Sequence, residues 1–575
     1  MDINHTELDL SPESIPLRRS VWLIFFSAAA VLLLILGKNP LLGSEGGSAE
    51  SIRLLLDGKD IFAVDRTFPP DSFIQLWLCR IQMLPALLLG NSEFSWRVFS
   101  MIPALLLLSG TMLLTDEIFG RRAMCCAGWM LIGSYGFIYW GRNAGNYIFL
   151  AAWSIWCAVL LYRKNFPFIV QTLFFFLVFS GSMWWGTHFI LALPGVIVAA
   201  YPRWKGNFFS RYTLFSALAG VAGALMISLL LLWHPGIAPV EYAVRFLHQL
   251  KCSFLESFAQ TCYAPLSAFD YGRHLVNLPR LIFPWILPAG FTVYWMIRKY
   301  KELSAEHRFL LWGAAVMFLL TGVFPSRRWQ FQLCQLPLFI MIASGGVTGK
   351  TVVGKYQDIM VMTMRWGAAV AGSFAVSVFV VFPLWDMIFN TSMPGWIMFA
   401  IPVLGLLALG ALVFDTGGTS AVEKYSGMRG SWSGYILAWT CLCIAVFAIG
   451  IPALGEYRTG KPFWQKCGQL AEQAKPGKVI FFNDAPEAQA LCYMDVSGRV
   501  YNAENEEGFL RESDGLKTAL VILHCRDYPE FKKILENSGW KTGENGDVIH
   551  EEGHLYLFGN KSGKNIFSAY LIRKK

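Results

Sequence analysis

Long apolar segments alternate with short polar loops along most of the chain, and a polar stretch follows the last of them. Most of these segments approach the roughly 20 residues that a helix needs to cross the apolar core of a bilayer. The pattern predicts a polytopic α-helical membrane protein with thirteen transmembrane helices. They are expected at 20–37, 97–115, 123–140, 147–162, 166–185, 187–201, 212–233, 279–297, 309–325, 329–348, 366–388, 394–414 and 432–454.

Arginine and lysine clusters in the short loops predict the orientation of these helices, because such clusters stay in the cytoplasm. Thirteen crossings from a cytoplasmic N-terminus then place the long first loop and the C-terminus outside it. The first segment is expected to be a retained anchor, because the residues after it do not resemble a cleavage site. The basic clusters are Arg18-Arg19, Arg121-Arg122, Arg163-Lys164, 203–211, 298–308, 350–365 and 424–429.

The apolar segment 72–89 would invert this orientation if it crossed the membrane. It carries Arg80 at its centre and Pro85 nearby, and a central arginine costs roughly 2.5–3.5 kcal/mol on insertion scales. We therefore interpret the segment as an interfacial or re-entrant helix on the outer side.

The polar stretch at the C-terminus predicts a small α/β domain outside the membrane. Its strand candidates are 479–482, 519–523 and 555–558, and its helix candidates are 507–512 and 530–538. The predicted organisation is a transmembrane domain at 1–455, with the first outer loop at 38–96, and an extracytoplasmic α/β domain at 456–575.

Composition restricts the function classes. With 55% hydrophobic and 15% charged residues, the chain does not match a soluble enzyme. The net charge of +9 is explained by inner loops that face anionic lipid, so we expect no nucleic-acid partner. The 12 cysteines form no CxxC pair, although Cys252 and Cys262 share an outer loop and could bridge. Histidines show no zinc-ligand spacing, and a divalent cation stays open as a cofactor.

Candidate chemistry concentrates in the outer loops. Glu45 and Glu50 lie in the first loop, with Glu45 on a glycine-flanked turn directly after a membrane helix. A carboxylate there suits a general base or a metal ligand, and the alternative is a solvated loop charge. Arg327 and Arg328 lie outside against the positive-inside trend, which suggests either a phosphate grip or snorkelling to lipid. The loop 234–278 is a candidate lid or acceptor groove.

The order of these elements resembles the C-type (GT-C) membrane glycosyltransferases of the aminoarabinose-transferase and protein O-mannosyltransferase (family 39) kind. In that family the first outer loop carries an Asp-Glu pair with a second glutamate five positions after the first, a Pro-Pro stretch opens an interfacial helix, and a Gly-Arg turn follows the third span. The matching positions here, with two connecting segments that also resemble the family, are Ser44-Glu45 with Glu50, Pro69-Pro70, Gly141-Arg142, 91–97 and 119–123.

The chain departs from the family pattern at three places. Ser44 replaces the leading aspartate, so Glu45 is the expected catalytic carboxylate, with Glu50 as its companion. Phe68 replaces a lysine, which leaves Arg66 as the nearest cation, and Asn146 or Tyr147 stands where a second aspartate is expected. The substrate-binding residues that the resemblance implies are Asp65, Arg66, Arg142, Asn146, Tyr147, Arg327 and Arg328.

The resemblance implies a hexosyl or pentosyl transferase that takes a sugar from a polyprenyl-phosphate donor. The acceptor would be a lipid, glycan or protein of the cell envelope, reached at the outer face of a bacterial inner membrane. Two alternatives stay open: a catalytically silent protein that binds a lipid-linked sugar, and a transporter or flippase. A transporter favours charges or broken helices at the membrane midplane, and the predicted spans contain few charges.

Overall fold

The computed structural model divides into two compact units, each described here by itself. The helical unit comprises Met1–Leu36 and Arg97–Ile451, and the mixed unit comprises Gly37–Trp96 and Pro452–Lys575. The structure describes residues 14–34, 36, 44–57, 76–144, 147–163, 167–204, 212–232, 238–251, 268–323, 329–349, 351–352, 355–389, 395–416, 433–452, 461–474, 477–483, 488–494, 500–503, 505–542, 548–550 and 567–574.

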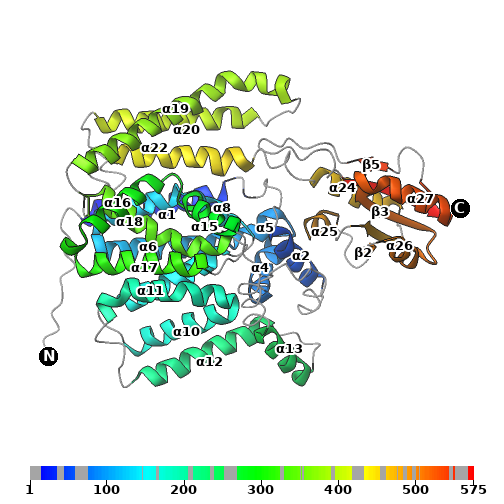
Figure 1. The fold of residues 1–575 in the computed structure, drawn as a ribbon, viewed down its shortest axis with the longest axis horizontal. Coiled ribbons are helices and arrows are strands. Elements are labelled where there is room, and N and C mark those ends of the chain that lie inside the picture. The colour runs from blue at the N-terminus through cyan, green and yellow to red at the C-terminus, as the bar shows by residue number, and fades with distance from the viewer. Residues whose placement is uncertain are drawn as a thin grey trace. The chain divides into compact units, whose positions relative to one another are not determined.

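Helices build the described part of the helical unit (Figure 1). They are α1 (Ser14–Leu33), α6 (Met101–Phe119), α7 (Arg121–Ile132), α8 (Tyr135–Trp140), α9 (Tyr147–Leu161), α10 (Phe168–Trp185), α11 (Thr187–Trp204), α12 (Thr213–Leu232), α13 (Pro239–Lys251), α15 (Ala268–Ile282), α16 (Ile286–Arg298), η2 (Tyr300–Glu302), α17 (Ala305–Val323), η3 (Trp329–Gln335), α18 (Leu336–Val347), α19 (Lys355–Phe389), α20 (Gly395–Thr416), α22 (Ser433–Cys443) and the π-helical η4 (Ile444–Gly450).

Each of the thirteen apolar segments falls on helix in this structure. Among the described residues, five helices are long and apolar enough to cross a membrane, or six if one bent pair forms a single span. Six further apolar helices are shorter, with 10–17 residues. The protein is thus a largely helical chain with several candidate membrane spans, and the number of thirteen crossings stays a prediction.

Several expected spans are not continuous α-helices, and two of them contain a well-defined break. The segment 123–140 breaks into α7 and α8 at Gly133 and Ser134, where the Ser134 hydroxyl caps α8 by accepting from the Phe137 amide. The segment 279–297 contains a bend of 114° between 275–282 and 286–298. Pro284 lies in this bend and has no amide hydrogen to continue the helix. Apolar composition alone did not reveal either break.

Close helix packing at glycine holds α11 against α17. A methyl group built on Gly195 would meet the Gly313 carbonyl oxygen at 2.7 Å, and one built on Gly313 would meet the Gly195 oxygen at 2.6 Å. Small residues allow backbones to approach this closely, which is a main source of attraction between helices that share an apolar solvent. Helices α19, α20 and α22 form a bundle in which each contacts the other two (Figure 1).

The mixed unit combines helices from the first loop with the C-terminal α/β region. Its boundary with the helical unit falls inside α5. Its elements are α2 (Ser44–Leu56), α4 (Leu76–Leu89), α5 (Glu93–Val98), α24 (Lys461–Ala474), β1 (Lys478–Phe482), α25 (Ala488–Met494), β2 (Val500–Ala503), α26 (Glu506–Ser513), β3 (Thr518–His524), η5 (Cys525–Asp527), α27 (Tyr528–Ser538), β4 (Trp540–Thr542), β5 (Val548–His550) and β6 (Phe567–Lys574).

The strands of this unit form a six-stranded sheet in the order β2-β1-β3-β6-β4, and β5 also pairs with β6. Strand β1 runs parallel to both β2 and β3, whereas β6 is antiparallel to β3, β4 and β5. Both faces of the central strands are covered, which explains why β1 and β3 are continuous apolar runs. Alternate residues enter two cores, so Ile480 and Phe482 lie on one face while Val479 and Phe481 lie on the other.

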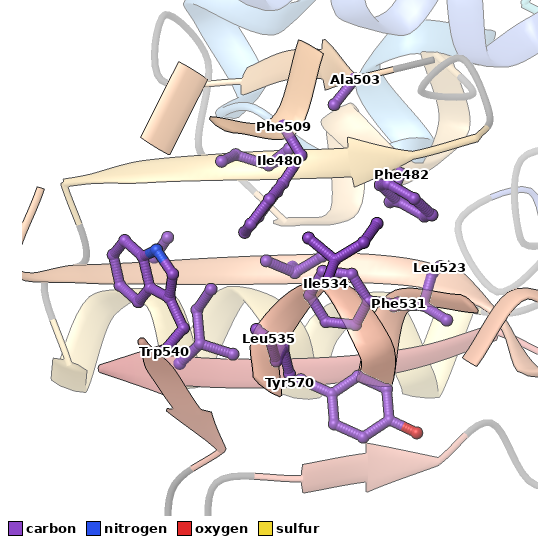
Figure 2. Close-up of a cluster of buried hydrophobic side chains, with 13 residues drawn as sticks. Ile480, Phe482, Ala503, Phe509, Leu523, Phe531, Ile534, Leu535, Trp540 and Tyr570 are labelled. Atoms are coloured by element: carbon purple, nitrogen blue, oxygen red, sulfur yellow. The ribbon is translucent and has the colours of Figure 1, made fainter. Parts of the chain in front are cut away.

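Figure 2 shows the first of these cores, where Phe482 meets Phe509 of α26 and Phe531 of α27. The second core contains residues of α24 and α25, among them Trp464 and Met494. The unit therefore has a sheet with helices on both faces, and α24 and α25 cover one of them.

Expected and observed elements of the C-terminal region overlap in part. Strands β1 and β3 and helices α26 and α27 coincide with four of the expected elements. The expected strand at 555–558 lies outside the described residues. Strand β6 was not expected from the sequence, although it pairs with three neighbours.

The expected interfacial segment corresponds to α4, which belongs to the mixed unit and contains Pro85 inside the helix. It buries Leu78 and Gln82 and exposes Leu87 and Leu88. Such exposed leucines suit an apolar environment such as a bilayer interface, and the interfacial placement stays a prediction.

Candidate functional site

The first-loop carboxylates lie on α2, and this corrects the expected glycine-flanked turn. Gly46 and Gly47 are inside the helix, and Glu45 is in its first turn. Glycine is a poor helix former, but tertiary packing overrides such a local preference. Here α2 packs against α4 and α25, and Ala49 and Ile52 are fully buried. The packing of α2 therefore decides the backbone around Glu45.

Glu45 and Glu50 are both buried, with 3% and 2% of their surface exposed. Glu50 accepts two hydrogen bonds from Arg53, at 2.6 Å and 2.8 Å, in a two-pronged ion pair. Five positions separate the two glutamates, which turns them about 140° apart around the helix. The structure thus gives Glu50 a fixed cationic partner, while Glu45 lies at the helix N-terminus, where the helix dipole favours a negative charge.

The Gly-Arg turn lies between α8 and α9 in the helical unit. Arg142 is 4% exposed, and its guanidinium donates to the Ala448 carbonyl in η4 at 2.9 Å and to the Leu34 carbonyl just after α1. Carbonyls at a helix end have no partner within their own helix, so a cation stabilises them well. Arg142 therefore ties two helical segments to this turn, and its expected contact with substrate stays a prediction.

The residues around Arg142 are also buried. The Asn143 carbonyl accepts a hydrogen bond from Ser100 at 2.6 Å. Tyr147 starts α9 and packs edge-on against Trp140, with ring centres 5.2 Å apart. Of the two positions where the resemblance predicts a second aspartate, 147 thus carries a buried aromatic side chain and 146 lies outside the described residues.

Several predicted site residues lie outside the part of the chain that the structure describes. They are Asp65, Arg66, Asn146, Arg327 and Arg328. The expected lid at 234–278 is described over α13 and the start of α15. There the Tyr242 hydroxyl donates to the Leu229 carbonyl near the end of α12. This hydrogen bond holds α13 against α12.

One polar cluster was not predicted from the sequence. Glu93, at the start of α5, is 8% exposed and accepts from Lys461 of α24 at 2.9 Å and 3.0 Å, and from the Tyr493 hydroxyl of α25 at 2.5 Å. These residues lie 368 and 400 positions from Glu93, so no local pattern could have paired them. The only available signal was a glutamate next to Ser92 at a helix start.

No metal site emerges from the described residues, where no group of three or more His, Cys, Asp and Glu side chains is placed to hold an ion. Three polar features of the described residues bear on function: the α2 carboxylates, the buried Arg142 and the Glu93 cluster.

No protein-family model matches the chain, and no curated protein matches it in sequence. Solved structures do match. ArnT from Cupriavidus metallidurans bound to undecaprenyl phosphate gives a TM-score of 0.64 at 13% identity, over 96% of this chain and 98% of that chain. The apo state of the same protein gives 0.61 at 11% identity, with the same coverage.

The oligosaccharyltransferase of Archaeoglobus fulgidus in its apo form matches less well, with a TM-score of 0.43 at 14% identity, over 87% of this chain and 69% of that chain. We draw the fold assignment from the ArnT structures alone. Over nearly its full length, this chain has an ArnT-like fold.

Proposed function

We propose that the protein is a membrane glycosyltransferase that moves a sugar from a polyprenyl-phosphate donor to an acceptor in the cell envelope. The observation that carries this proposal is a buried glutamate, Glu45, on the first-loop helix of a chain with the ArnT fold. The ArnT structure with undecaprenyl phosphate supports a lipid-phosphate donor for this chain as well.

The proposed reaction is an inverting displacement. Glu45 takes the proton from an acceptor hydroxyl, the hydroxyl oxygen attacks the anomeric carbon, and the bond from that carbon to the phosphate oxygen breaks. Negative charge then develops on the leaving phosphate, where cations stabilise it. Arg66, Arg327 and Arg328 are the proposed phosphate ligands.

The other predicted residues are assigned to donor and sugar binding: Asp65, Arg142, Asn146 and Tyr147. Glu50 is assigned a supporting part in catalysis, beside its two-pronged ion pair with Arg53.

We also propose that the first loop and the C-terminal region lie on the same, extracytoplasmic side of a bacterial inner membrane. Within the mixed unit α2 packs against α25, and Lys461 binds Glu93. Segments in such contact cannot be separated by a bilayer. Together with the basic inner loops, this favours the outer side for both.

A silent binder of lipid-linked sugars is the second candidate function. Two features favour it: Glu50 forms an ion pair with Arg53, and Asn146 or Tyr147 stands where the resemblance predicts an acid. A protein of this kind would keep the donor groove and lack transfer.

The test compares Glu45→Gln with the parent protein in a deletion strain, using mass spectrometry of envelope lipids and glycans. We expect transfer to fall by about two to four orders of magnitude, the usual contribution of a positioned general base. Binding of undecaprenyl phosphate to the purified variant, followed by tryptophan fluorescence, should match the parent. Asp57→Asn is the matched control, because Asp57 is exposed just after the same helix.

Two outcomes would change the proposal. Transfer by Glu45→Gln at the parent rate would remove Glu45 as the base. A parent protein that binds undecaprenyl phosphate while its deletion alters no envelope component would favour the silent binder.

A further inference from the structure

We propose that Glu93, Lys461 and Tyr493 form a positioning cluster that holds α2, and therefore Glu45, in its working orientation. The inference rests on the proposed role of Glu45. It assigns to the C-terminal region a part in catalysis without direct contact with substrate.

The contacts around α2 form a closed ring. Helix α2 packs against α4 on one side and against α25 on another, and α24 packs against α25. Residues 90–92 alone separate α4 from Glu93. When Glu93 binds Lys461 and Tyr493, the end of α4 is fastened to α24 and α25. The two neighbours of α2 are thereby joined to each other.

The start of α5 fixes the direction of the Glu93 side chain. The Ser95 amide donates to the Ser92 hydroxyl oxygen at 3.3 Å, and the Ser92 amide donates to the Ser95 hydroxyl at 3.1 Å. This reciprocal arrangement is a capping box with serine at the third helical position. Trp96 adds a bond from its indole nitrogen to the Asn91 side-chain oxygen at 2.8 Å.

The cluster satisfies both oxygens of a buried carboxylate. Lys461 reaches each oxygen, and its ammonium also lies 5.4 Å from the centre of the Tyr493 ring. A buried charge that loses its partner is costly, so the cluster strongly favours one relative placement of these helices. Fixing a single geometry is what a catalytic carboxylate requires of its surroundings.

Close backbone packing also holds α24 against α25. A methyl group on Gly468 of α24 would meet the Met494 carbonyl oxygen at 2.6 Å. The two helices that carry Lys461 and Tyr493 are thus rigidly apposed, and they share a core that contains Phe463, Trp464 and Ala490. Among the described residues, that core contains none from the first loop, so we expect the α/β fold to survive loss of the cluster.

The experiment measures hydrogen exchange of the α2 amides in the full-length protein, together with sugar transfer and undecaprenyl phosphate binding. Lys461→Met and Glu93→Gln should speed exchange in α2 by about tenfold or more, because local opening becomes easier. Exchange in β1 and β3 should stay at the parent level. The turnover number for sugar transfer should fall, whereas the affinity for undecaprenyl phosphate should stay unchanged.

Lys478→Met is the matched control. Lys478 also forms an ion pair in the mixed unit, with Glu512 at 3.1 Å, but this pair contains no first-loop residue. It should leave α2 exchange and transfer unchanged. Tyr493→Phe removes one hydrogen bond and should give a smaller effect than Lys461→Met, and a Glu93→Lys, Lys461→Glu exchange should recover part of the loss.

Parent-like α2 exchange in both Lys461→Met and Glu93→Gln would overturn the inference. So would faster α2 exchange with transfer equal to the Lys478→Met control. If the parent protein transfers no sugar, the proposed function fails, and the exchange measurement still decides whether the cluster holds α2.

Discussion

Among the described residues, cations of the two units contact different kinds of group. In the helical unit, Arg142 and Arg97 donate to backbone carbonyls, at Leu34 and Ala448 for the first and at Leu36 for the second. In the mixed unit, Arg53 and Lys461 bind the carboxylates of Glu50 and Glu93. A carbonyl at a helix end offers partial negative charge without an ion to bury, which suits apolar surroundings where an ionised side chain is expensive.

The sheet core of the mixed unit is also packed differently from the helix contacts of the helical unit. Helices of the helical unit approach backbone to backbone at glycines such as Gly195 and Gly313. The sheet of the mixed unit is instead filled by large rings, and Phe482, Phe509 and Phe531 contact one another (Figure 2). Water drives the burial of rings, whereas close contact and hydrogen bonds stabilise helices that share an apolar solvent. Polar residues in the two units should therefore respond differently to substitution.

The largest expected effect is at Arg142. Arg142→Met leaves the Leu34 and Ala448 carbonyls without this donor. A hydrogen bond to a charged group contributes about 1.5–3 kcal/mol, so we expect the free energy of unfolding to fall by about 3 kcal/mol. Thermal unfolding of the purified protein in detergent would measure it. Arg142→Lys keeps the charge but presents it at one point, so it should recover only part. An unchanged unfolding temperature with lost undecaprenyl phosphate binding would leave Arg142 only its proposed part in donor binding and remove the structural one.

A smaller effect is expected at the α11–α17 contact. Gly313→Ala places a methyl group 2.6 Å from the Gly195 carbonyl oxygen and 2.6 Å from the Ala199 Cβ. The helices must separate, at a cost of about 1–3 kcal/mol typical of overpacking. Gly290→Ala is the control, because nothing lies within 4 Å of the added methyl. Equal unfolding temperatures for the two variants would show that close glycine packing is unimportant here.

The smallest effect is a pH dependence in the mixed unit. Lys478 donates a hydrogen bond to Glu512 and thereby lowers the pKa of that carboxyl from its ordinary 4.5. A lowered pKa in the folded state gives stability that is present above pH 4.5 and is lost as the pH falls through the folded value.

The Glu512 contribution should stay below about 1 kcal/mol, because the pair is partly exposed and water screens it. Lys478→Met should flatten the acid side of the unfolding profile, as followed by hydrogen exchange in β1 and β3. An unaltered profile would assign the acid sensitivity to other carboxylates.

The sequence by itself determined the features that depend on local pattern. Apolar length located the helices at the thirteen expected spans, because burial in lipid requires a continuous run, but it did not predict α13 in the loop 234–278. The strands at Val479–Phe482 and Ala519–Leu523 were likewise visible as short apolar runs between polar residues. Strand β6 was missed, although it carries the apolar run Ala569–Ile572.

The candidate site was likewise predictable from the sequence only in part. The resemblance to a glycosyltransferase family identified Glu45 and Arg142 as residues of interest, because those motifs are contiguous in sequence. Their surroundings came only from the tertiary structure: the packing of α2 made a helix out of a glycine-rich loop, and Arg142 binds carbonyls from segments far away in the chain. Glu93 meets Lys461 and Tyr493 across about two thirds of the sequence. Pairing of that kind depends on the packing of whole helices, and no local pattern of residues encodes it.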